Sequence, residues 1–399
     1  MSRLLVITEL FLPTKGGTAV WAGEVYKRLG GKEIHIVTAD VPGAAEVDAT
    51  HPNTIHRLDF RRVPWLRPES LAIYVRLFVK ALRLAMTERF EAIHAFRALP
   101  EGLVAWAVAQ LVSRPVVIYA HGEELTSWGR GGKYQAMRFA LRHADRIIAN
   151  SEHTVGSLVA MGVPATRITV IHPGVDVSVF HPGLDGSGLR ESLGIKLDEK
   201  LVFSVGRLAR RKGFDQVIRA VAQLRREGVP VRYVIAGIGE DMDYLDGLIR
   251  EQHLRGAVHM LGAIDTQDLA RWMNACDVFA MPNRDINGDN EGFGMVFIEA
   301  AACGKPSLAG EAGGTGAAVL HEITGLRVDG LSREAVTAGL RRLLTESDWA
   351  AGLGQAGWSR VAQEFSWARV AEKTSILALR KSDAGPDPAH QRSPSRTKP

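Results

Sequence analysis

Short runs of β-branched and apolar residues alternate along this chain with longer segments of helical periodicity. In the first half, the runs that predict strands lie at residues 4–8, 34–38, 92–94, 116–120, 146–149 and 168–171. The rhythm starts again after residue 200, with predicted strands at 201–205, 232–236, 258–261, 278–281, 306–309 and 326–328. Such alternation is typical of parallel βαβ units, and its restart predicts an α/β chain with two doubly wound, Rossmann-like domains.

The segment 172–195 separates the two halves. It is rich in Gly and Pro and has no apolar period, which predicts a linker. We therefore expect an N-terminal domain over 1–177 and a C-terminal domain over 178–366, with a last helix at about 367–381 that packs back on the first domain. The tail 382–399 consists largely of Ser, Pro, Asp, Arg and Lys and is expected to be disordered.

The composition is that of an ordinary globular protein and excludes fibrous and low-complexity classes. Of 399 residues, 46% are hydrophobic, 23% charged and 7% aromatic. Cys276 and Cys303 both lie in apolar segments, so we expect buried thiols, no disulfide framework and a reducing cytoplasm. The N-terminal segment reaches a Pro and Gly turn too early for a secretory signal, and the longest uncharged apolar stretch, 102–112, is too short for a bilayer. Neither export nor membrane insertion is expected.

Positive charge is concentrated in one segment. The whole chain has a net charge of +5, and residues 57–89 hold eight basic and three acidic side chains. The basic fraction is too low for a typical nucleic-acid binder, and no recognisable module is present, so no nucleic acid is expected as a partner. An anionic surface or small molecule fits better.

A predicted helix within this segment is amphipathic. Three cations share one of its faces, at i, i+4 and i+7: Arg76, Lys80 and Arg83. Apolar positions lie beside them, at Phe78, Leu82 and Ala85. This pattern predicts peripheral contact with an anionic membrane on the inner face of the cell. The alternative is a solvated helix face on a soluble enzyme.

The segment GRLARRKG combines a strand end with a basic loop and the start of a helix. The predicted strand ends at Gly206, and the free N–H groups of the following helix favour an anion. Arg207 and Lys212 add two cations there, which predicts a diphosphate site. Neither the Walker spacing nor GxGxxG is present. The neighbouring Arg210 and Arg211 are expected to be solvated.

Other chemistry lies at further strand ends. Gly237 and Gly239 allow close approach of backbone to a ligand, although ordinary turns use glycine too. Gly16 and Gly17 place flexible N–H groups at the start of the first helix. His121 follows a hydrophobic strand where doubly wound sheets bind ligands. Two glutamates follow Gly122, Glu123 and Glu124, and one of them can approach an acceptor hydroxyl.

Two carboxylates eight positions apart, Glu291 and Glu299, mark the segment EGFGMVFIE. On a helix that starts near Gly292 they would be separated by about 80° in azimuth and about 12 Å along the axis. They cannot form one acid/base dyad, but they can hold two parts of one extended ligand. Glu299 is surrounded in sequence by apolar residues and needs a partner. A ribose diol offers two donors, and a buried ion pair with an arginine is the alternative.

Together, the motifs GRLARRKG, EGFGMVFIE, AAACGKP, HPGVD, AHGEE and the first Gly-Gly loop resemble the family-4 glycosyltransferases, which are retaining enzymes with the GT-B fold. The resemblance runs over about 1–381. Within the family it is greatest to phosphatidylinositol mannosyltransferases and bacterial polysaccharide transferases. One departure is the segment 313–317, GGTGA, where relatives often have Gly-Gly-x-Pro-Glu, so that Ala317 replaces a glutamate.

The resemblance implies roles for individual residues. Arg207 and Lys212 would hold the donor diphosphate, Glu299 the ribose and Glu291 the sugar hydroxyls. Gly16 would contact the β-phosphate, and His121 would lie by the transferred sugar. The remaining donor-site positions implied are Gly17, Gly206, Gly237, Gly239, Gly292, Phe293 and Gly294.

The implied reaction moves a hexosyl group of mannose or glucose type from a GDP-sugar or UDP-sugar to a hydroxyl, with retention. The acceptor would be lipid-linked or a polysaccharide precursor, bound by the N-terminal domain. No DxD metal pair stands at a plausible strand end, so neither a metal nor another cofactor is expected. The alternatives are a soluble glycosyltransferase with a small acceptor and a GT-B epimerase or phosphorylase. A dehydrogenase is disfavoured because the first loop of this chain lacks the glycine spacing that such an enzyme requires. A non-catalytic sugar-binding protein is disfavoured because such proteins are normally exported.

Overall fold

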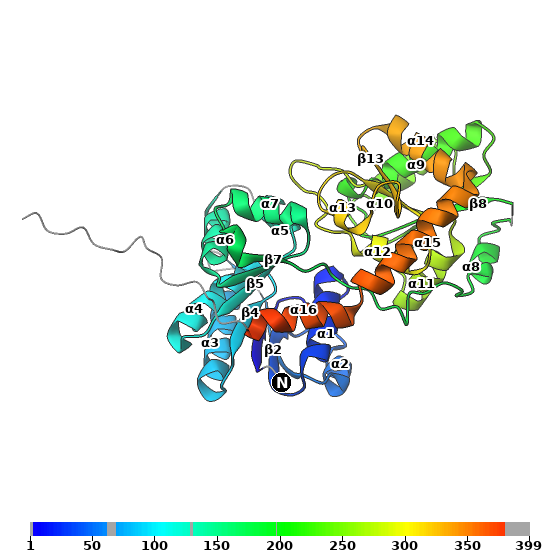
Figure 1. Ribbon diagram of the computed structural model, residues 1–399. Helices are drawn as coiled ribbons and strands as arrows, with labels where there is room; N and C mark the ends of the chain where they lie inside the picture. Colours follow the sequence, from blue (N-terminus) through cyan, green and yellow to red (C-terminus); the bar gives the residue numbers. More distant parts are fainter. Residues whose placement is uncertain (1–2, 62–68, 128–130, 197, 380–399) are drawn as a thin grey trace, which may run out of the picture.

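Two parallel β-sheets, each covered by helices, form the two halves of the protein (Figure 1). The computed structural model describes residues 3–61, 69–127, 131–196 and 198–379. The tail 382–399 lies outside these ranges, and so do Arg62 and Arg67 of the basic segment. Across the described residues, no helix is long and apolar enough to cross a membrane. Both cysteines are buried and free.

The N-terminal sheet has seven parallel strands in the order β3-β2-β1-β4-β5-β6-β7. The strands are β1 (Leu4–Ile7), β2 (Ile34–Ala39), β3 (Thr54–Leu58), β4 (Ala92–Ala95), β5 (Val116–Ala120), β6 (Arg146–Ala149) and β7 (Ile168–Val170). The helices are α1 (Gly17–Leu29), α2 (Ala44–Thr50), α3 (Leu71–Thr87), α4 (Leu103–Val112), α5 (Glu123–Ser127), α6 (Gly132–His143) and α7 (Glu152–Ala160), with short turns η1 (Ala98–Gly102) and η2 (Ala165–Arg167). The sequence pattern missed β3 because this edge strand is only half-buried and carries His and Arg.

The C-terminal sheet has six parallel strands in the order β10-β9-β8-β11-β12-β13. They are β8 (Lys200–Val205), β9 (Val231–Ala236), β10 (Val258–Gly262), β11 (Val278–Met281), β12 (Ser307–Gly310) and β13 (Gly325–Val328). Its helices are α8 (Ser187–Ser192), α9 (Phe214–Arg226), α10 (Met242–Glu251), α11 (Thr266–Ala275), α12 (Met295–Ala302), α13 (Thr315–Ala318), α14 (Arg333–Thr345) and α15 (Ser347–Glu364), with a turn η3 (Arg210–Lys212). The prediction of two doubly wound domains is confirmed.

Burial on both faces explains why the strands read as unbroken apolar runs. Every residue of β1, β4 and β5 is buried, as expected for parallel strands between two helical layers. In both sheets the strand order reverses at one point, between β1 and β4 and between β8 and β11. Doubly wound sheets bind ligands outside the carboxyl ends of the strands at such a reversal. The loops after these strands are therefore the ones that matter for function.

The chain passes between the domains twice. The first passage, 172–195, is less irregular than predicted, because it contains α8 and because Val175 pairs with Ser366 in a short parallel bridge. The second passage leads into α16 (Trp367–Leu379), the red helix in Figure 1, which lies beside α1 of the N-terminal domain. Trp367 is buried in a core with Leu4 and Trp21. The last helix thus completes the first domain.

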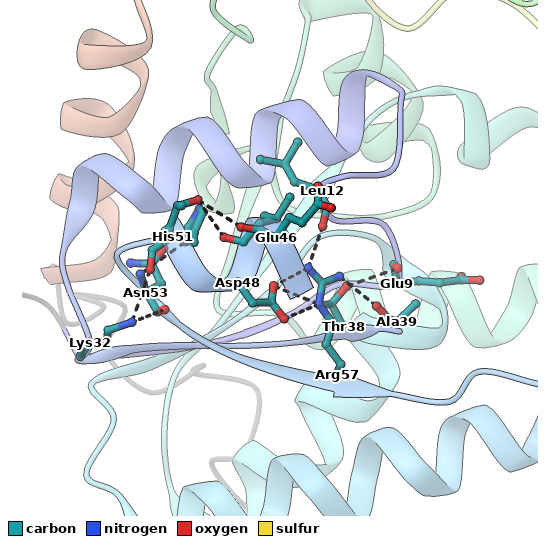
Figure 2. A network of polar contacts seen from close by, with 12 residues as sticks. Glu9, Leu12, Lys32, Thr38, Ala39, Glu46, Asp48, His51, Asn53 and Arg57 are labelled. Carbon is teal, nitrogen blue, oxygen red and sulfur yellow. Dashed lines mark hydrogen bonds and ion pairs between the residues drawn. The ribbon is translucent and has the colours of Figure 1, made fainter. Parts of the chain in front are cut away.

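Arg57 on β3 is an internal anchor rather than a surface charge (Figure 2). Its guanidinium donates to the Leu12 carbonyl at 2.7 Å and to the Ala39 carbonyl at 3.0 Å, and it pairs with Asp48 at 2.7 Å. Leu12 lies in the loop that leads to Gly16. Arg57 therefore fixes the start of that loop, and although it is one of the eight basic residues counted in 57–89, it adds little to the surface charge.

Removal of the Trp367 indole should destabilise the docking of α16. Trp367 is only 3% exposed, so Trp367→Ala should lower the free energy of unfolding by about 3 to 5 kcal/mol. Urea unfolding followed by circular dichroism measures the loss. Trp358 on α15 is 40% exposed, and Trp358→Ala should cost about 1 kcal/mol or less. Equal losses would contradict the assignment of Trp367 to the core of the first domain.

Candidate active site

Loops from the carboxyl edges of both sheets meet between the domains. Gly292, in the loop after β11, touches the loop after β5 so closely that a Cβ there would lie 1.9 Å from the His121 carbonyl oxygen. Ser151, at the N-terminus of α7, donates its hydroxyl to the Gly292 carbonyl at 2.8 Å. Gly17 lies against the Met295 side chain. The two sets of predicted donor-site residues therefore face one another.

The strongest charges at this junction form one cluster. Lys212 donates to Oε2 of Glu291, and Arg211 pairs with the same oxygen at 3.1 Å. Arg211 also pairs with Glu123 of the N-terminal domain at 3.4 Å. Its side chain is only 8% exposed, so the expectation of a solvated Arg211 was wrong: three carboxylates surround it, the third being Asp289.

The other cations of the β8–α9 loop lie outside this cluster. Arg207 is 67% exposed and pairs with Glu240 at 3.1 Å. Arg210 lies over the ring of Tyr244 and pairs with Asp241 at 3.2 Å. Arg207 and Lys212 therefore come from one loop but hold different carboxylates, and only Lys212 lies in the interdomain cluster.

Glu291 precedes the helix rather than standing on it. Helix α12 begins at Met295, because Gly294 adopts a left-handed conformation at its N-cap with φ 85°. The helical geometry predicted for the pair Glu291 and Glu299 was therefore wrong, although Glu299 does lie inside α12. Burial pushes the pKa of Glu291 upward, but the charges of Lys212 and Arg211 bring it below its usual value. Glu291 is held as a carboxylate.

Glu299 is the opposite case. Its Oε2 is buried and, among the described residues, has no hydrogen-bond partner. No described arginine or lysine forms an ion pair with it, so the alternative of an internal ion pair receives no support. Burial raises the pKa of Glu299 to about 7. A carboxylate with a buried, unpartnered oxygen, on the helix that follows the β11 loop, is chemically suited to accept hydrogen bonds from a ligand, and its ribose role stays a prediction.

Several glycines serve the packing of loops. A Cβ at Gly237 would lie 1.9 Å from the Gly206 carbonyl oxygen, and a Cβ at Gly239 would lie 2.4 Å from the Leu208 carbonyl oxygen. The close approach predicted for these glycines is thus to the protein's own backbone. Gly16 differs, since it has φ 133° and open space around it.

The Phe293 side chain is buried against two other aromatic rings. Its ring stacks on His172 with centroids 5.4 Å apart and meets Phe365 edge-on. Its side chain is therefore part of the core, and the donor role predicted for Phe293 stays a prediction that its backbone would have to fulfil. His172 and Phe365 lie on the two chain passages between the domains, which together form the hinge. Phe293 therefore connects this hinge to the loop that holds Glu291.

His121 is held by the first domain. Its Nε2 lies 2.7 Å from the Phe96 carbonyl oxygen, so Nε2 carries the hydrogen and Nδ1 keeps a lone pair. Burial lowers the pKa of His121, which favours this neutral form. Glu124 accepts the His121 backbone N–H at 2.9 Å, while Glu123 is engaged by Arg211. Neither glutamate is positioned as a free partner of an acceptor hydroxyl.

The sequence reasoning missed three residues of this junction. Arg211 was assigned to solvent, and Asn150 and Ser151 were not considered. Asn150 donates to the His121 carbonyl at 2.5 Å, next to the bond from Ser151 to Gly292. Their position directly after the predicted strand 146–149 was the signal that could have found them.

Comparison with known proteins defines the class. Residues 187–360 match the family model described as glycosyl transferases group 1, and residues 15–179 match glycosyltransferase family 4. A GDP-mannose-dependent alpha-(1-6)-phosphatidylinositol monomannoside mannosyltransferase of Mycobacterium tuberculosis is 30% identical over 90% of this chain and 93% of its own. A relative from Corynebacterium glutamicum is 29% identical over 94% of this chain and 97% of its own length. It is named a GDP-mannose-dependent monoacylated alpha-(1-6)-phosphatidylinositol monomannoside mannosyltransferase.

Solved structures agree on the fold. Anabaena HepE in complex with UDP and glucose superposes with a TM-score of 0.79 at 21% identity, over 94% of this chain and 99% of that one. Sucrose-phosphate synthase from Thermosynechococcus elongatus superposes with a TM-score of 0.80 at 25% identity, over 94% of this chain and 98% of that one. The two facing Rossmann-like domains are those of a GT-B glycosyltransferase. The chain belongs to glycosyltransferase family 4, as its motifs predicted.

The raised pKa of the Glu299 carboxyl, whose Oε2 is buried, should make the ligand-free protein less stable as pH rises. Its pKa is about 7 when folded and near 4.5 otherwise, so the folded state holds a proton that the unfolded state releases between these values. The free energy of unfolding should therefore fall by about 1 to 3 kcal/mol between pH 5 and 8 relative to Glu299→Gln. Urea unfolding across this range tests the difference. Glu191→Gln, at an exposed position, should leave the slope as in the wild type.

Proposed function

We propose that the protein transfers a mannosyl group from GDP-mannose to a hydroxyl of a lipid-linked acceptor, with retention at the anomeric carbon. The observation that carries the donor half is the Lys212–Glu291 pair at the domain junction, where Gly17, next to the open Gly16, contacts Met295 at the start of α12. Cations and free N–H groups at this place suit a leaving diphosphate. The donor in the names of two relatives, GDP-mannose, supports the choice of base and sugar.

In this proposal each charged group has a task. Lys212 and Arg207 stabilise the negative charge that develops on the diphosphate as the glycosidic bond breaks, and they take the place of a metal ion. Glu299 accepts the ribose hydroxyls, which supply the donors that its carboxylate lacks within the protein. His121, neutral with a lone pair on Nδ1, accepts from a sugar hydroxyl. Since Lys212 is bound to Glu291 in the ligand-free state, donor binding must exchange one anion for another.

Nucleotide titration tests the donor. We expect GDP to raise the melting temperature in a concentration-dependent way and UDP and ADP to do so far less. A product with mannose linked to an acceptor alcohol is the second requirement, and its anomeric configuration in the first minutes, by NMR, tests retention. Turnover that needs only phosphate, or no acceptor, would instead assign a phosphorylase or an epimerase.

Loss of either diphosphate cation should slow transfer far more than loss of their neighbour. Lys212→Ala and Arg207→Ala should each lower kcat about 100- to 1000-fold, because the developing charge is left uncompensated. The affinity for GDP should fall as well. Arg210→Ala removes a cation of the same loop that stacks on Tyr244, and the kcat of this variant should stay within about 2-fold of the wild type. Near wild-type turnover in either of the first two variants, with the fold intact, would sink the phosphate assignment.

Helix α3 supports the acceptor half, with a correction. The apolar residues predicted beside its cations, Phe78, Leu82 and Ala85, pack partly against the core. The exposed apolar stripe consists instead of Leu71, Val75, Val79 and Met86. Arg83 is exposed next to it, whereas Arg76 donates to the Asp59 carbonyl at 2.6 Å. An exposed apolar stripe beside cations suits the surface of an anionic leaflet, and we propose peripheral binding at the inner face of the membrane.

Vesicle co-sedimentation tests this surface. We expect binding to anionic but not to neutral vesicles, and release at high salt. Lys80→Ser with Arg83→Ser should weaken binding roughly 30-fold, at about 1 kcal/mol per cation. Val75→Ser with Val79→Ser should weaken it too. Arg250→Ser on α10 is the control on the other domain. Indifference to lipid charge would favour a small soluble acceptor.

A further inference from the structure

Among the residues that the structure describes, Arg211 is the one of the β8–α9 loop whose side chain pairs with carboxylates of both domains. Its Nη1 lies 3.1 Å from Glu291 and its Nε 3.2 Å from Asp289, both in the loop after β11. Its Nη2 lies 3.4 Å from Glu123 on α5 of the first domain. A planar guanidinium offers donors in several directions at once, so one side chain can serve all three carboxylates.

Contacts within the C-terminal domain fix the backbone of Arg211. Its carbonyl accepts the Arg284 backbone N–H at 2.8 Å. The Arg284 side chain, itself buried, holds both oxygens of Asp215 on α9, at 2.8 and 2.9 Å. Asp215 thus ties the loop after β11 to the helix that follows η3. The Arg211 guanidinium therefore projects from a rigid base.

Glu291 depends on two cations in the ligand-free state, and one of them has another task. Lys212 and Arg211 both bind its Oε2. When Lys212 turns to a donor diphosphate, Glu291 would be left buried and charged with no partner if Arg211 were not there. An unpaired buried carboxylate is costly and tends to protonate or move. Arg211 is the partner that can remain.

We propose that Arg211 is a positioning residue that keeps Glu291 in place once Lys212 has moved to the diphosphate, and that its bond to Glu123 couples this support to domain closure. In the open arrangement the bond to Glu123 is absent, and Arg211 is held by the C-terminal domain alone. The site is then fully assembled only when both domains contribute. The proposal rests on the proposed function in so far as Glu291 faces the donor sugar.

Domain closure without ligand is the first test, and it needs no transfer activity. Small-angle scattering, or energy transfer between dyes on α6 and α10, reports the distance between domains. Arg211→Gln and Glu123→Gln should both shift the ligand-free protein toward an open state, and raised salt should do the same to the wild type. Arg210→Gln, next in sequence, should not. An unchanged profile for both Arg211→Gln and Glu123→Gln would overturn the coupling.

Kinetics are the second test, with GDP-mannose as donor. Arg211→Gln should lower kcat about 10- to 100-fold and raise the Kd for GDP by a clearly smaller factor. GDP lacks the hexosyl group that Glu291 would hold, although its diphosphate also draws Lys212 away from Glu291. Loss of a cation raises the pKa of Glu291, so the acid limb of the kcat profile should move to higher pH. Arg211→Lys should recover part of kcat and of that shift.

A merely structural role for Arg211 predicts another result. GDP affinity and kcat would fall in parallel, the acid limb would stay in place, and Arg211→Lys would not rescue either. That outcome would overturn the proposal. If the wild type itself transfers no sugar from any nucleotide donor, the proposed function fails, while the closure measurement still decides whether Arg211 links the domains.

Discussion

The arrangement of the site depends on backbone-to-backbone contact that only glycine allows. The loop from Glu291 to Gly294 lies between the His121 loop of one domain and the Gly313–Gly314 turn of its own. A Cβ at Gly292, Gly313 or Gly314 would lie about 2 Å from a neighbouring carbonyl oxygen. Any side chain there would push the loops apart and would separate Glu291 from Lys212. The constraint is steric, and it sets the positions at which the charged groups can meet.

Within that frame, most charges are compensated before a ligand arrives. Lys212 is matched by Glu291, Arg211 by three carboxylates and Arg207 by Glu240. Glu299 is the exception, since its buried carboxylate has no partner among the described residues and keeps a raised pKa. Compensation keeps the buried charges tolerable in the empty protein, and it makes ligand binding an exchange of partners rather than a simple addition of contacts.

The hinge belongs to the same mechanical unit. Val175 and Ser366 join the two chain passages, and Trp367 anchors the second one in the N-terminal core. His172 stacks on Phe293, which lies between Gly292 and Gly294 in the loop after β11. A change in the domain angle therefore reaches the Glu291 loop through a ring contact as well as through the Arg211 ion pairs. Closure and site assembly share residues.

The sequence alone determined the two doubly wound domains, the family and the motif positions, because strand periodicity, glycine turns and short motifs are local patterns. It missed β3, whose edge position leaves it polar, and it placed Glu291 on a helix that Gly294 delays until Met295. Only the tertiary structure decided that Arg211 is buried, that Arg57 is internal and which face of α3 is exposed. Each of these depends on partners far away in the chain, such as Glu123 for Arg211, and no local pattern encodes such a distance.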